Sequence, residues 1–151
     1  MDSPSSTIGD INLTVAHDTL EAPAGLEDRV RTAVRLEGFV VGELSIVLAD
    51  HQTVTSLNEQ HLSRPYATDV LAFDLGEPGR DDSEKRIDGE IYVDLDTAVE
   101  RAPEFGSSYD QEVCRYVIHG LLHLLGYRDD KPESRKQMKR LENLYLSEAS
   151  K

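Results

Sequence analysis

The chain has 151 residues, of which 38% are hydrophobic and 30% charged, and its formal net charge is −13. This composition is typical of a folded soluble protein with one domain rather than of a disordered or membrane-bound chain. No apolar run approaches the roughly 20 residues that span a bilayer, and residues 1–10 lack a secretory signal pattern. A single cysteine, Cys114, excludes an internal disulfide bond, so we expect a cytoplasmic protein.

Alternating strands and helices are expected through the first two thirds of the chain. Runs of apolar residues, some alternating with polar ones, predict four strands near residues 11–15, 44–48, 70–75 and 90–93. Helical spacing predicts a helix over about 25–38 that ends near Gly38, and Asp50 can cap a short helix through Leu57. Residues 76–86 are rich in Gly, Asp and Glu and are expected to form a mobile loop.

The segment from Ser108 to Leu125 has the pattern of a central helix. Ser108 with Gln111 three residues later is a capping-box signature. Apolar residues then cover most of the helix circumference, which is typical of a buried helix, and Gly126 is expected to end it. A last helix from about Pro132 should pack its apolar residues inward, namely Met138, Leu141 and Tyr145.

Two histidines on this central helix suggest a metal site. His119 and His123 are four residues apart, so both imidazoles project from one face, one turn apart. Gly126 lets the chain reverse, and Asp129, ten residues after His119, can then turn back towards the metal. The spacing matches the metzincin pattern with Asp129 as the third ligand. Three protein ligands around one zinc ion leave the fourth position for water, the arrangement of a catalytic site.

Other interpretations of these residues compete with the metal site. Two histidines on an apolar helix are often core residues, and Asp129 can be a surface residue, although the combined spacing favours a metal. Cys114 lies on a different helix face and is expected to be a buried core thiol. A peptidase is disfavoured because Gly120 stands where zincin peptidases place their glutamate base.

The run from His119 to Tyr127, His-Gly-Leu-Leu-His-Leu-Leu-Gly-Tyr, resembles the signature of the YbeY family of bacterial endoribonucleases. The resemblance extends in order over roughly residues 40–130 and includes three weaker stretches, Leu57-Asn58, Thr68 to Phe73 and Gly89-Glu90-Ile91. It implies a single α+β domain over 1–151, with a mixed four-stranded sheet, helices packed around it and a central, zincin-like helix that binds one zinc ion. It also implies a single-strand-specific endoribonuclease in 16S rRNA 3'-end maturation and ribosome quality control.

The chain departs from the family pattern at three positions. Asp129 stands where the third zinc-binding histidine is usual, which keeps a ligand but adds a negative charge. Leu62 stands where many members have an arginine thought to face the cleft, and Arg64, two residues on, can replace it. Ala72 stands where a serine is common.

The leading hypothesis is therefore a zinc-dependent endoribonuclease, a metal-dependent hydrolase in which Arg64 steadies developing negative charge. The net charge argues against an RNA partner, yet residues 101–151 carry 9 basic and 8 acidic side chains. Four of these basic residues are expected to bind the RNA backbone, unless they form an ordinary solvated surface: Arg128, Lys131, Arg135 and Lys139. The alternative function is a non-catalytic, zinc-stabilised ribosome-assembly factor that binds rRNA or a small-subunit ribosomal protein.

Overall fold

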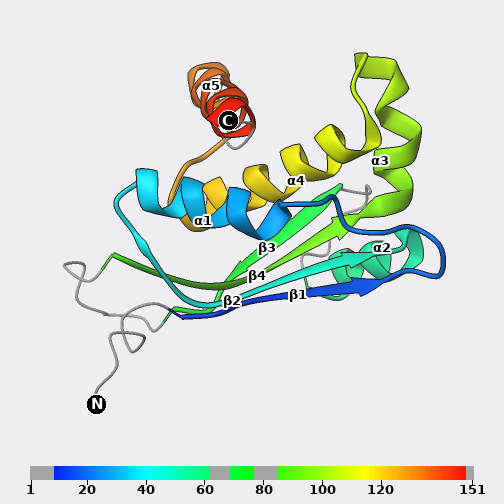
Figure 1. The fold of residues 1–151 in the computed structure, drawn as a ribbon, viewed down its shortest axis with the longest axis horizontal. Helices are drawn as coiled ribbons and strands as arrows, with labels where there is room; N and C mark the ends of the chain where they lie inside the picture. Colours follow the sequence, from blue (N-terminus) through cyan, green and yellow to red (C-terminus); the bar gives the residue numbers. More distant parts are fainter. Residues whose placement is uncertain (1–8, 62–68, 77–84, 149–151) are drawn as a thin grey trace.

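A four-stranded sheet forms the centre of the computed structural model, which describes residues 9–61, 69–76 and 85–148 (Figure 1). Its strands are β1 (Ile11–Ala16), β2 (Val40–Ala49), β3 (Val70–Asp74) and β4 (Arg86–Asp94). They lie in the order β1-β2-β4-β3. β1 is parallel to β2 and β2 to β4, whereas β3 runs antiparallel to β4 at the edge. The predicted mixed sheet is confirmed.

Helices cover both faces of this sheet. α1 (Leu26–Leu36) and α4 (Tyr109–Leu124) lie on one face, and α5 (Pro132–Glu148) packs on their outer side (Figure 1). α2 (His51–His61) lies on the opposite face, against β3 and β4. The result is the single-domain α+β fold that the sequence predicts. None of the helices in the described parts of the chain is long and apolar enough to cross a membrane.

The predicted central helix is α4, and its start and burial are as expected. The Ser108 side chain accepts a hydrogen bond from the Gln111 amide at 3.1 Å, and the Gln111 side chain accepts one from the Ser108 amide at 3.0 Å. This is the capping box expected from the sequence. Most apolar side chains of the helix are almost fully removed from solvent, among them Val117, Ile118, Leu121 and Leu122. Burial on this scale fixes the position of the helix, and therefore the points from which its side chains project.

Among the described residues, the sequence analysis failed to predict one helix, α3 (Leu95–Arg101), which is followed by a 3-10 turn at Pro103–Phe105. The Asp94 side chain caps α3 by accepting a hydrogen bond from the Thr97 amide. β2 and β4 also begin earlier than predicted, at Val40 and Arg86. Most of the predicted loop, residues 77–84, lies outside the described residues.

The carboxyl ends of β2 and β4 are joined by His51 and Asp94. Nδ1 of His51 lies 2.6 Å from Oδ2 of Asp94, whose side chain is 1% exposed. The hydrogen bond with Asp94 raises the pKa of His51 above 6.5, although burial opposes the shift. A base whose pKa is higher in the folded state binds protons more tightly there, so folding is favoured at low pH.

We expect the substitution His51→Gln to remove a pH-dependent part of the stability. The contribution of protonated His51 is fully present below about pH 6.5 and is lost as the pH rises through the pKa of the folded state. Because the imidazole is half exposed, the stability difference between wild type and variant should fall by less than about 1 kcal/mol from pH 5.5 to pH 8. Urea denaturation at both pH values measures it. A stability difference that does not change with pH would contradict the proposed contribution of protonated His51.

Candidate metal centre

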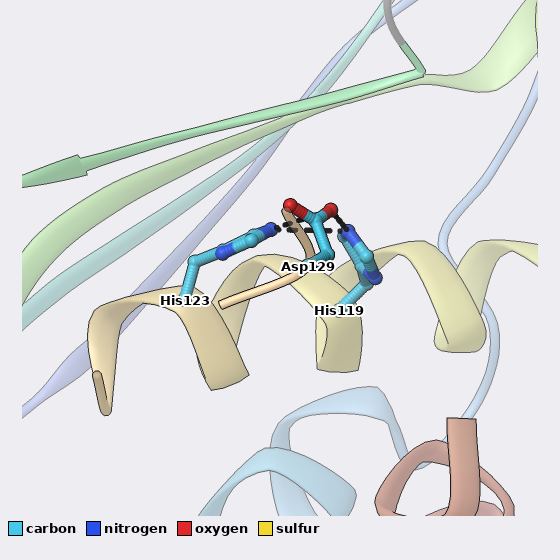
Figure 2. A group of neighbouring side chains, drawn as sticks. All are labelled: His119, His123 and Asp129. Carbon is cyan, nitrogen blue, oxygen red and sulfur yellow. Dashed lines mark hydrogen bonds and ion pairs between the residues drawn. The ribbon is translucent and has the colours of Figure 1, made fainter. Parts of the chain in front are cut away.

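His119, His123 and Asp129 converge on one side of α4, with the two imidazoles one helical turn apart (Figure 2). The two Nε2 atoms are 3.2 Å apart. Oδ2 of Asp129 lies 3.4 Å from Nε2 of His119 and 3.3 Å from Nε2 of His123. The structure therefore brings together the three residues that the sequence analysis selected as ligands.

The spacing of these three atoms fits a tetrahedral metal ion. A tetrahedron with metal–ligand bonds of about 2.0–2.1 Å has ligand atoms separated by about 3.3–3.4 Å. The three observed separations, 3.2 to 3.4 Å, agree with those edges. The side chains keep partial exposure, between 28% and 45%, so water or a substrate can reach the fourth position.

The turn after α4 brings Asp129 back to the histidines. Gly126 has a positive φ of 106°, a conformation that side chains disfavour. The Gly126 amide donates a hydrogen bond to the His123 carbonyl, and the Tyr127 amide donates one to the Leu122 carbonyl. These two bonds form a Schellman motif, which ends the helix and reverses the chain. The sequence predicted this reversal from Gly126.

Hydrogen bonds on the far side of each ring orient the two imidazoles. Nδ1 of His119 lies 2.7 Å from Oε2 of Glu142, and Nδ1 of His123 lies 3.1 Å from the carbonyl oxygen of Tyr127. A carboxylate and a carbonyl only accept hydrogen bonds, so each Nδ1 carries the proton. In a neutral ring with this tautomer the lone pair is on Nε2, the atom that faces Asp129 in both histidines. A metal ion that holds both rings in this form would then meet three ligand atoms.

The surroundings of His119 favour positive charge at this position. Burial lowers the pKa of His119, but the hydrogen bond and charge of Glu142, together with Asp129, outweigh burial and raise the pKa above its ordinary value. Two carboxylates therefore create a field that attracts a cation. The same field suits a divalent metal ion.

The residue after His119 faces the sheet and leaves no space for a side chain. A Cβ atom on Gly120 would lie 2.9 Å from Cγ2 of Ile91 and 3.1 Å from Cγ2 of Val70. Ile91 is fully buried, so moving it aside would disturb the core. The glutamate of a zincin peptidase is thus sterically excluded at this position, in agreement with the sequence argument against a peptidase.

Of the remaining predicted site residues, the structure describes only the four basic ones. Arg64, the predicted catalytic residue, lies outside the described residues, as do Leu62 and Thr68. The four basic residues selected for RNA binding are all exposed or partly exposed: Arg128, Lys131, Arg135 and Lys139. Arg128 contacts Asp130 at 3.2 Å, and Nη1 of Arg135 donates to the carbonyl oxygen of Asp129 at 3.3 Å. Cys114 is a free, buried thiol, as expected.

The sequence analysis missed Glu142 and Arg115. Glu142 lies on α5, is 7% exposed, and contacts both His119 and Nη1 of Arg115, the latter at 3.1 Å. A signal was present in the sequence, because Glu142 lies four residues after Met138 and three before Tyr145 and therefore shares the apolar face of α5. A glutamate on such a face requires a buried partner.

Comparison with known proteins relates the whole chain to one family. The family model described as endoribonuclease YbeY matches residues 7–150. The endoribonuclease YbeY of Salinibacter ruber is 45% identical over 141 residues, which cover 89% of this chain and 90% of that protein. The endoribonuclease YbeY of Chlorobaculum parvum is 34% identical, covering 80% and 82%. A solution structure of a Thermotoga maritima protein, 27% identical, covers 93% of this chain and 89% of its own with a TM-score of 0.63.

The fold and the three-residue group define an α+β protein with a candidate metal-binding helix. The match to the family model over nearly the full length identifies the protein more specifically. The chain belongs to the YbeY family, a family of endoribonucleases, which are hydrolases acting on RNA.

We expect the substitution Gly120→Glu to destabilise the protein by about 3 kcal/mol or more, because a carboxylate would be forced against Ile91 and Val70. Urea denaturation measures the loss. The matched control is Gln111→Glu on the same helix, which adds the same side chain at an exposed position and should change stability by less than about 0.5 kcal/mol. Equal stability of the two variants would show that α4 does not approach the sheet this closely.

Proposed function

We propose that this protein is a zinc-dependent, single-strand-specific endoribonuclease that acts in 16S rRNA 3'-end maturation and ribosome quality control. His119, His123 and Asp129 would hold one zinc ion. The observation that carries this proposal is the convergence of their three acceptor atoms at the spacing of a tetrahedral site, in a chain whose relatives are named as endoribonucleases.

A zinc ion at this position would polarise a phosphoryl oxygen and lower the pKa of a water molecule at the open position. The protein's own residues prepare the site for this chemistry. Glu142 and the Tyr127 carbonyl hold the Nδ1 protons, which directs both Nε2 lone pairs inward. Arg64 is proposed to steady negative charge that develops on the phosphate.

The basic side chains of the last third support an RNA substrate. Lys131, Arg135 and Lys139 follow one another at intervals of four residues, and the Arg135 amide donates to the Lys131 carbonyl, as in a helical turn. Arg135 also contacts the main chain of Asp129, which connects this surface to the proposed metal ligand. We propose that these residues and Arg128 bind the RNA backbone.

The second candidate is a zinc-stabilised ribosome-assembly factor that binds rRNA or a small-subunit ribosomal protein without cutting RNA. It is favoured by Gly120, which removes the general base that zincin enzymes place beside the metal. Both functions imply a cytoplasmic protein. They differ in one measurable property, the cleavage of RNA by the zinc-loaded protein.

We expect Asp129→Ala to weaken zinc binding by more than about 100-fold, because even residues that only support a ligand contribute 10- to 100-fold. It should also abolish the zinc-dependent rise in melting temperature and the cleavage of a single-stranded RNA oligonucleotide. Competition with a chromophoric chelator, thermal melts and gel analysis measure these effects. Asp130→Ala is the matched control, because Asp130 pairs with Arg128 outside the three-residue group.

Wild-type protein that binds no zinc would contradict the proposed metal centre. Zinc and RNA binding without cleavage would instead favour the assembly factor. Cleavage of double-stranded RNA at an equal rate would contradict the proposed single-strand specificity.

We expect the double substitution Arg135→Glu and Lys139→Glu to weaken RNA binding. It should also flatten the dependence of log affinity on log salt by roughly one unit for each phosphate that the protein no longer neutralises. The control is the double substitution Lys136→Glu and Arg140→Glu, which changes the net charge equally on a neighbouring side of α5. Zinc content should stay intact in both variants. Equal salt slopes for the two variants would show that only net charge matters, and that the proposed basic face is an ordinary solvated surface.

A further inference from the structure

We propose that Glu142 is a positioning residue for the metal centre, which fixes the tautomer and orientation of His119 and strengthens it as a ligand, with Arg115 holding the other carboxylate oxygen. This inference rests on the proposed metal centre. It concerns a residue that does not itself belong to the three-residue group.

Glu142 contacts Arg115 through one carboxylate oxygen and His119, a candidate metal ligand, through the other. One carboxylate oxygen, Oε2, lies 2.7 Å from Nδ1 of His119, and the other, Oε1, accepts from Nη1 of Arg115 at 3.1 Å. The Glu142 side chain is 10% exposed, whereas that of Arg115 is 31% exposed. Water therefore competes little for the carboxylate, and its charge acts mainly on the imidazole and the guanidinium.

The position of Glu142 is fixed by packing that does not involve the metal centre. Met138 and Tyr145, one turn before and one turn after it on α5, are 1% and 3% exposed. The Tyr145 hydroxyl donates a hydrogen bond to Glu37 at the end of α1, and Nη1 of Arg29 donates to the main chain of Leu146. α5 is thus anchored at both sides of Glu142, so the carboxylate is held in place before any metal ion binds.

The two histidines differ in the group behind the ring. Nδ1 of His123 meets a neutral carbonyl at 3.1 Å, whereas Nδ1 of His119 meets a carboxylate at 2.7 Å. A hydrogen bond to a charged acceptor is shorter and roughly twice as strong as one to a neutral acceptor. Electron density is therefore pushed onto Nε2 of His119, which becomes the stronger of the two imidazole ligands.

A purely structural role is the competing explanation, in which the Arg115–Glu142 ion pair only joins α4 to α5. The two roles differ in what each substitution changes. A structural pair affects the stability of the metal-free protein, whereas a positioning residue also changes zinc affinity and the proton on His119. The experiment must therefore measure these properties separately.

Three variants separate the charge, the hydrogen bond and the ion pair. Glu142→Gln keeps an acceptor but removes the charge, and Glu142→Leu removes both. The double variant Arg115→Met with Glu142→Leu replaces the ion pair by apolar side chains, which keeps the fold free of an unpaired buried charge. Glu112→Gln is the matched control. Glu112 is buried like Glu142, but it is on α4, two turns or about 10 Å before His119.

Zinc affinity is measured by chelator competition, and the His119 tautomer by nitrogen-15 NMR of the metal-free protein. We expect Glu142→Leu and the double variant to bind zinc about 10- to 100-fold more weakly, with Glu142→Gln between them and wild type. In both leucine variants the Nδ1 proton of His119 should become shared between the two ring nitrogens. The control should stay within about threefold of wild type.

Zinc affinity of the leucine variants within about threefold of wild type, together with an unchanged His119 tautomer, would overturn the role of Glu142 while leaving the metal centre intact. Failure of wild-type protein to bind zinc would instead overturn the metal centre, and this inference with it. Melting of each variant in the presence of chelator identifies any loss of the fold, and the double variant then carries the test.

Discussion

The close approach of α4 to the sheet is the constraint on which the rest of the structure depends. A Cβ atom on Gly120 would press against Ile91 and Val70, and one on Gly89 of β4 would press against Leu124. Two glycines, one on each partner, therefore let the helix lie directly on β3 and β4. Since neighbouring helix positions are rigidly related, this contact also determines where His119 and His123 point.

The other side of the site depends on contacts between helices. Glu37, at the end of α1, accepts hydrogen bonds from the hydroxyls of Tyr127 and Tyr145. Tyr127 lies in the turn that returns Asp129, and Tyr145 lies on the helix that carries Glu142. One carboxylate thus connects both segments that approach the histidines from outside α4. The candidate metal centre is built between a rigid helix and a turn that is fixed at both ends, as preorganised sites require.

The sequence could predict those parts of the site that depend on local spacing. His119, His123 and Asp129 lie within eleven residues, and helix periodicity with a glycine-ended turn is enough to bring them together. Glu142 could not be found in this way, because its contact with His119 depends on how α5 docks, 23 residues along the chain. α3 was missed for a related reason: it is only 7 residues long and begins directly where β4 ends. The role of Arg64 stays a prediction.

The charges around the site link the proposed metal centre to the proposed RNA surface. With neutral imidazoles, a divalent ion and Asp129 sum to one positive charge, whereas a third histidine would leave two. Glu142 adds a negative charge that Arg115 balances within the same ion pair. Such a centre would therefore attract a phosphate less strongly than a three-histidine centre. In a chain of net charge −13, exposed cations near the Asp129 segment can supply part of the remaining attraction, and Arg135, which contacts the Asp129 carbonyl, is placed to do so.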